Sequence, residues 1–146
     1  MEKLTNSTSA TLPKMIDVLV DTNMLIYAMD KSSIHHDLAS EVLLDRNHNL
    51  FTTTKNISEF FAVSSKLKIP LKKSLSFYAD LKANISILFP TAESLSIFEG
   101  LIQKYTPKGN RVYDVEIVSV MIAHSVSTVS TLNLKDFAGI TEVQIL

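Results

Sequence analysis

Apolar and polar residues follow two different periods along this chain. Five short apolar runs have the length of buried strands, and they lie at residues 16–20, 50–53, 85–89, 128–132 and 143–146. Six intervening segments repeat apolar residues at helical spacing, and they lie at residues 22–29, 33–46, 56–67, 71–81, 91–105 and 114–122. Strands separated by helices specify a mainly parallel sheet of about five strands with helices on both faces. The pattern therefore predicts an α/β domain.

Composition fits one globular domain and narrows the chemistry. Of the 146 residues, 46% are apolar and 20% are charged, which is enough for one hydrophobic core. The chain has no cysteine, so disulfides, thiolate metal sites and a cysteine nucleophile are excluded. Residues 1–14 are polar and lack the apolar stretch of a signal peptide, so we expect a flexible tail there. We expect a single domain over residues 15–146, a cytoplasmic location and no membrane insertion.

Four acidic residues take related places in this pattern. Asp21 follows the first strand, and Glu59 lies in the first turn of the helix after the second strand. Asp114 begins a helix that is apolar on nearly all sides, and Asp136 follows the fourth strand. Because the carboxyl ends of parallel strands share one edge of a sheet, we expect these acids to lie near one another, where open α/β sheets bind ligands.

Such a group of acids favours a divalent cation. Two carboxylates ~4 Å apart repel by about 4 kcal/mol at an effective dielectric constant of 20, and a bound cation removes that cost. Mg²⁺ and Mn²⁺ prefer oxygen ligands, acidify water and neutralise phosphate charge, so an in-line attack on a phosphodiester becomes feasible. The chain has no Gly-rich phosphate loop, no Gly-x-Ser-x-Gly elbow and no closely spaced histidine pair of the zinc type.

Each acid also has a purely structural interpretation. Asp21 and Asp114 are suitable helix N-caps, Glu59 suits a capping-box-like pair with Asn56, and Asp136 suits a turn. Four such coincidences at one sheet edge are much rarer than any one of them.

Two other acidic positions stay open at this point. Asp30 is more typical of a helix end or turn than of a metal ligand. Glu116 either adds a further carboxylate or faces water.

Four segments carry the resemblance to a known family. In order they are VDTNMLIYAMD (20–30), NISEFFAV (56–63), GNRVYDVEIVSVMIAH (109–124) and TLNLKDF (131–137). They resemble the four motifs of the PIN domain, and within that family of VapC-type toxin ribonucleases, with Asp21, Glu59, Asp114 and Asp136 as the four acids. The match runs over residues 16–146. It departs from the family pattern at Val115 and Glu116, where small or apolar residues are commoner, and at Ser127, where a glycine often stands.

The resemblance implies both a fold and an activity. The fold is a PIN-like (Rossmann-like) three-layer sandwich. The activity is that of a Mg²⁺- or Mn²⁺-dependent endoribonuclease that hydrolyses RNA and is paired with a small antitoxin protein, often as a homodimer. Four polar residues beside the acids would then orient the carboxylates: Thr22, Asn23, Thr131 and Asn133. Of these, Thr131 and Asn133 are equally well explained as ordinary polar groups at the end of a strand.

Basic residues bear on whether RNA binds. The net charge is −1, but setting aside four of the 15 acidic residues as ligands leaves 11 against 14 basic ones. Lys66, Lys68, Lys72 and Lys73 bracket Pro70 and would bind RNA phosphates, or they form an ordinary solvated turn. Arg111, just before Asp114, is a further candidate for nucleic-acid binding.

Two other functions compete with the metal-dependent ribonuclease. One is a catalytically weak PIN module that binds RNA or a protein partner. The other is a phosphohydrolase that uses Asp21 as a covalent nucleophile. That chemistry commonly needs a second acid two residues further on, where this chain has Asn23.

Overall fold

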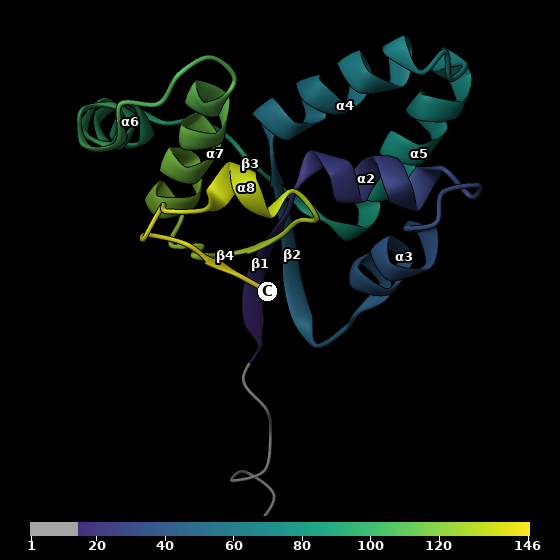
Figure 1. The fold of residues 1–146 in the computed structure, drawn as a ribbon. Coiled ribbons are helices and arrows are strands. Elements are labelled where there is room, and N and C mark those ends of the chain that lie inside the picture. Colours follow the sequence, from purple (N-terminus) through teal and green to yellow (C-terminus); the bar gives the residue numbers. More distant parts are fainter. Residues whose placement is uncertain (1–14) are drawn as a thin grey trace, which may run out of the picture.

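The chain folds around one parallel sheet with helices on both faces (Figure 1). A computed structural model describes residues 15–146, and the predicted tail over residues 1–14 lies outside the described residues. The strand order is β3-β2-β1-β4-β5, and all pairings are parallel. The strands are β1 (Ile16–Val20), β2 (His48–Thr53), β3 (Ser86–Leu88), β4 (Thr128–Ser130) and β5 (Gln144–Ile145). The predicted α/β sandwich with about five parallel strands is confirmed.

Seven helices connect these strands within residues 15–146. They are α2 (Thr22–Met29), α3 (His36–Leu44), α4 (Thr54–Lys66), α5 (Leu71–Asn84), α6 (Ala92–Tyr105), α7 (Arg111–Ala123) and α8 (Leu134–Phe137). None of the helices in this described part of the chain has both the length and the apolar character needed to cross a bilayer.

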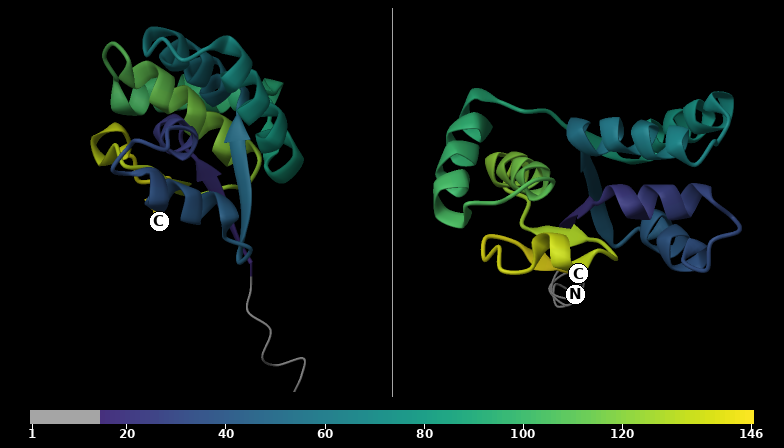
Figure 2. Two further views of the ribbon diagram at one scale, coloured as in Figure 1. Left: turned by 90° about the vertical axis from the view of Figure 1, so that its right-hand side faces the viewer. Right: turned by 45° about the horizontal axis from the view of Figure 1, so that its top comes forward.

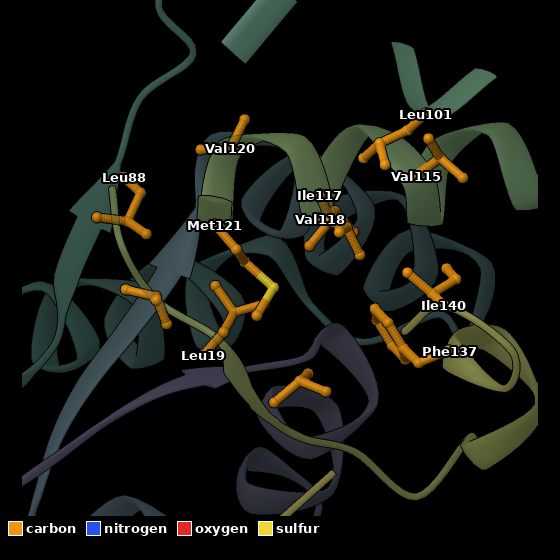
Figure 3. Close-up of a cluster of buried hydrophobic side chains, with 12 residues drawn as sticks. Leu19, Leu88, Leu101, Val115, Ile117, Val118, Val120, Met121, Phe137 and Ile140 are labelled. Carbon is orange, nitrogen blue, oxygen red and sulfur yellow. The ribbon is translucent and has the colours of Figure 1, made fainter. Parts of the chain in front are cut away.

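The alternation of side chains along β1 divides the core into two clusters. Leu19 is fully buried among residues of α6, α7 and α8, which form the cluster drawn in Figure 3. Val18 and Val20 point to the other face, where they pack with residues of α2 to α5. Figure 2 shows the same division, with α6, α7 and α8 on one side and α2 to α5 on the other. A strand buried on both faces explains why residues 16–20 are almost continuously apolar.

Two element boundaries differ from the sequence prediction for local reasons. The helix expected from residue 33 begins at His36, because Ser33 forms a turn in which its hydroxyl accepts a hydrogen bond from His35 N. The strand expected over residues 128–132 ends at Ser130, because Thr131 turns its hydroxyl toward Asp21.

The beginnings of three helices place the polar residues of the site. Helix α4 begins at Thr54 because Thr53, rather than Asn56, is its N-cap. Helix α7 begins at Arg111, so Asp114 lies inside its first turn and the N-cap interpretation of Asp114 is wrong. Helix α8 has four residues, too few to show a helical period in the sequence, and it holds Asp136, which is therefore not a turn residue.

Candidate functional site

Asp21 lies where β1 ends and α2 begins, at the carboxyl edge of the sheet. Its backbone N–H donates to Ser130 O at 3.0 Å, which continues the pairing of β1 with β4. Its side chain accepts from Thr22 N at 2.9 Å, so Asp21 is also the N-cap of α2. The capping interpretation is therefore right. Asp21 can also belong to a functional site, because only Oδ1 caps the helix and Oδ2 makes other contacts.

Both carboxylate oxygens of Asp21 are held by side-chain donors from distant segments. Oδ1 accepts from Asn56 Nδ2 at 3.1 Å. Oδ2 accepts from Asn23 Nδ2 at 3.0 Å and from Thr131 Oγ1 at 2.9 Å. The residue is only 6% exposed, so these bonds fix the carboxylate in one orientation.

Asn56 connects this carboxylate to α4, and sequence reasoning missed its role. It is fully buried, and its Oδ1 accepts from Thr53 N at 3.2 Å and from Thr53 Oγ1 at 2.6 Å. Its Nδ2 donates to Asp21 Oδ1 and to Thr22 Oγ1. Thr53 and Asn56 thus form the capping box of α4, and the proposed pairing of Glu59 with Asn56 is wrong. The Thr-x-x-Asn spacing after a strand was the signal for this arrangement.

Glu59 reaches the same region from the next turn of α4. Its Oε2 accepts a hydrogen bond from Thr22 Oγ1 at 3.0 Å. Thr22 is therefore hydrogen-bonded to Asp21, Asn56 and Glu59, and these four residues form one hydrogen-bond network.

All four predicted acids line one cavity of about 490 Å³, which we call the acidic cavity. Asp114 comes from the first turn of α7, and Asp136 comes from α8. Ile26, Val63 and Leu67 form part of its apolar wall. Within residues 15–146, no Lys, Arg or His side chain lines this cavity.

Burial and mutual repulsion shape the electrostatics of this cavity. Burial, followed by the negative charges of Asp136, Asp21 and Glu59, raises the pKa of Asp114 to about 7. Burial also raises the pKa of Asp21 and that of Glu59 above their ordinary values, although hydrogen bonds from Thr131 and Thr22 oppose the shifts. The acidic cavity therefore favours either protons or a cation.

The residues present fit a hard divalent cation by type of donor. Carboxylate oxygens are the ligands that Mg²⁺ and Mn²⁺ prefer, and a cation removes the repulsion that raises the pKa of Asp114. In residues 15–146, however, no three Asp, Glu or His side chains are already grouped as a metal site. Side-chain movements would be needed to complete a coordination shell.

The other polar residues predicted for the site take different places. Thr131 accepts from Asn133 N at 3.0 Å, and Asn23 Oδ1 accepts from Leu132 N at 3.0 Å, so both hold the chain after β4 against Asp21. The side chain of Asn133 lines the acidic cavity.

The two acids left open by the sequence lie apart from each other. Asp30 lines the acidic cavity, and its Oδ1 also accepts from Ser32 N at 3.1 Å as a turn residue. Glu116 lines a different groove, beside Ser119 and Phe98.

The predicted basic residues differ in which cavities they line. Lys72 and Lys73 line a second cavity together with Lys31, which the sequence analysis did not single out, whereas Lys66 and Lys68 lie outside it. The guanidinium of Arg111 donates to Lys135 O at 3.5 Å and to Ala138 O at 3.2 Å, so it ties α7 to the segment around α8.

Solved structures with the same fold come from bacterial toxin-antitoxin pairs. VapBC2 from Rickettsia felis, bound to a promoter DNA fragment, is 20% identical over 90% of this chain and 98% of the matched chain, with a TM-score of 0.69. DNA-bound VapBC from Salmonella typhimurium is 19% identical over the same shares, with a TM-score of 0.66.

A third solved structure is that of a toxin. VapC20 from Mycobacterium tuberculosis, described as a sarcin-ricin loop cleaving toxin, is 14% identical over 77% of this chain and 86% of that one, with a TM-score of 0.62. A comparison with curated proteins gave no match.

The family itself follows from the sequence. The family model of the PIN domain matches residues 18–142, which include all four acids, the last three residues of β1 and the whole of β2, β3 and β4, but not β5. The fold, the order of the four motifs and this match agree, and the chain belongs to the PIN domain family.

Proposed function

We propose that the acidic cavity is the active site of a divalent-metal-dependent endoribonuclease that hydrolyses RNA phosphodiester bonds. The observation that carries the proposal is the convergence of four carboxylates, from four separate segments, on one cavity without a basic lining residue among residues 15–146. Membership of the PIN domain family supports it, as does the likeness in fold to a toxin that cleaves the sarcin-ricin loop.

Different residues of the acidic cavity would bind the cation, orient its ligands and contact the substrate. Asp21, Glu59, Asp114 and Asp136 would hold Mg²⁺ or Mn²⁺, and the ion when bound would acidify water and neutralise phosphate charge. Four neighbouring donors hold the Asp21 carboxylate in place, and Thr22 orients Glu59. The apolar wall offers a surface for the nucleotide beside the scissile phosphate.

Cleavage of RNA by the purified protein tests this proposal. The wild type should cleave a structured RNA with Mn²⁺ or Mg²⁺ and stop when EDTA is added. Asp21→Asn should lower the rate at least a hundredfold, because the neutral amide is a poor ligand for a hard cation. Asp37→Asn makes the same chemical change on the exposed side of α3 and should cleave like the wild type. Equal rates for the two variants would overturn the assignment.

A second function is supported by one specific observation. Because no three acids within residues 15–146 are already grouped as a metal site, a catalytically weak PIN module that binds RNA or a protein partner is the main competitor. Tight RNA binding without metal-dependent cleavage of any tested RNA would favour this module over the nuclease.

The biological setting we propose is that of a toxin paired with a small antitoxin protein. The VapBC relatives in fold are toxin-antitoxin complexes. Three exposed apolar side chains lie on α5 and in the turn that precedes it: Leu67, Leu71 and Leu75. Co-expression with the product of a small neighbouring gene should give a complex that survives gel filtration and inhibits cleavage. We also propose a homodimer, which light scattering of the purified chain would check.

A further inference from the structure

A second cavity lies beside the end of α2 and the beginning of α5. It has a volume of about 600 Å³, and three lysines line it: Lys31, Lys72 and Lys73. Met29 at the end of α2 and Phe77 on α5 add apolar surface to the same cavity. We call it the lysine cavity. In Figure 1 the ribbon of α5 passes behind that of α2.

The charge in the lysine cavity is strongly unbalanced. Asp80 is the one acidic residue that lines it, against three ammonium groups. None of the three lysines forms an ion pair with another residue of the segment 15–146. The first turn of α5 carries no acidic residue and its N-cap, Pro70, has no capping side chain, so the positive end of the helix dipole adds to the lysine charge. An anion in the cavity would relieve this repulsion.

The lysine cavity is next to the acidic cavity. Tyr27 and Asp30 line the acidic cavity, while Ala28 and Met29, between them in the sequence, line the lysine cavity. The last turn of α2 is therefore the wall between the two. The charge of Lys73 also contributes to lowering the pKa of Asp30, after the larger effect of its hydrogen bonds from Ser32, which agrees with a short separation.

The arrangement suits the backbone of a nucleic acid. A polymer with one phosphate at the four acids carries further phosphates at regular intervals on either side. Lysine side chains are flexible point charges that bind phosphate oxygens without a fixed geometry, so they suit a strand whose phosphates follow one another past the end of α2.

Resting on the proposed ribonuclease activity, we propose that the lysine cavity binds a backbone phosphate of the RNA strand whose scissile phosphate occupies the acidic cavity. Lys31, Lys72 and Lys73 position the strand and do not touch the reacting atoms. The substrate is therefore an RNA long enough to extend past the end of α2.

Matched charge variants test this assignment. The cavity variant carries Lys31→Gln, Lys72→Gln and Lys73→Gln. The control variant carries Arg46→Gln, Lys82→Gln and Lys108→Gln, at three exposed basic residues that line neither the lysine cavity nor the acidic cavity. Binding of a labelled single-stranded RNA is measured in the Asp21→Asn background with Mg²⁺ at several salt concentrations. The cavity variant should bind about tenfold more weakly at low salt, and its salt slope should fall by about 1 to 2 relative to the control.

Steady-state cleavage and RNA length sharpen the test. With Asp21 intact, the cavity variant should raise KM about tenfold and keep kcat at saturating RNA. Binding is also measured with a series of RNAs of increasing length. The affinity of the control variant for RNA should increase once the RNA is long enough to reach the lysine cavity, and the cavity variant should lack this increase. Urea denaturation checks that both variants are folded.

The outcomes separate this inference from the proposed function. If RNA is cleaved and the two variants behave alike, the lysine cavity is not a phosphate site and the ribonuclease stands. If RNA binding depends on the cavity but no metal supports cleavage, the phosphate site stands and the ribonuclease fails. If the cavity variant loses only the binding of poly-glutamate, the cavity receives an acidic protein segment and the inference is wrong.

Discussion

At the scale of single residues, Asn56 is the side chain on which the position of Asp21 depends most. It is fully buried, and all its side-chain hydrogen bonds join parts of the site: the capping box of α4 on one side, and Asp21 and Thr22 on the other. Its amide supplies both the donors and the acceptor that this position needs, which no carboxylate or apolar side chain does.

Replacing Asn56 tests this dependence. Asn56→Asp keeps the shape but loses the donor to Asp21 and buries another acid, so the free energy of unfolding should fall by about 2–4 kcal/mol. The rate of RNA cleavage by Asn56→Asp should also fall, even at temperatures where the variant is folded. Asn84→Asp, at an exposed amide that donates to Asp80 O, should change neither quantity by much. Urea denaturation and RNA cleavage measure both quantities, and an Asn56→Asp protein as stable and as active as Asn84→Asp would contradict the account.

How far the site could be predicted also differs residue by residue. The four acids were predictable because each lies close after a strand or within the first two turns of a helix, so topology brings them to one sheet edge. The role of Asn56 was missed because an Asn near a helix start reads as a cap, and only the register of α4 shows that Thr53 is the cap. Lys31 was missed because its neighbours in space, Lys72 and Lys73, are distant in sequence.

At the scale of elements, two helices have capping boxes of the same design with different consequences. Thr53 caps α4 and accepts from Asn56 N, and Thr91 caps α6 and accepts from Ser94 N. The α4 box is part of the hydrogen-bond network of the acids, whereas the α6 box lies outside the acidic cavity.

Substitutions of the two caps should therefore have similar effects on stability but different effects on RNA cleavage. Thr53→Ala and Thr91→Ala should each lower the free energy of unfolding by about 1 kcal/mol through the loss of a cap. Thr53→Ala should also lower cleavage roughly tenfold or more, because Asn56 loses the partner that orients it. Thr91→Ala should leave cleavage unchanged. An equal effect of both substitutions on activity would show that α4 acts only through general stability.

At the scale of the whole molecule, the four acids of the acidic cavity lower the stability of the folded state. Asp21 is buried and the other three carboxylates are half-buried, and burial and mutual repulsion raise the pKa of Asp114 to about 7 from an ordinary value of 3.8. The folded state then keeps a proton that the unfolded chain has already released between about pH 4 and pH 7. Stability from this group is therefore complete below the ordinary pKa and is lost as the pH rises through 7.

This linkage predicts a pH dependence in the absence of divalent metal. With EDTA present, the free energy of unfolding should decrease between pH 5 and pH 8. Asp114→Asn should reduce that decrease by about 1–2 kcal/mol, since each pKa unit corresponds to about 1.4 kcal/mol and solvent at this half-buried site screens part of it. Urea denaturation of the wild type, Asp114→Asn and Asp37→Asn measures the difference. A wild type whose stability is flat or rises over this range would contradict the buried repulsion.

The most direct measurement is the location of a bound cation. Crystals grown at neutral pH with Mn²⁺ would give an anomalous difference map in which manganese is identified by its own scattering. The account predicts a peak inside the acidic cavity, within direct or water-bridged reach of Asp21 and Asp114, and no such peak in crystals of Asp21→Asn. A fully loaded crystal with manganese bound elsewhere, or with the acidic cavity empty of metal, would contradict it.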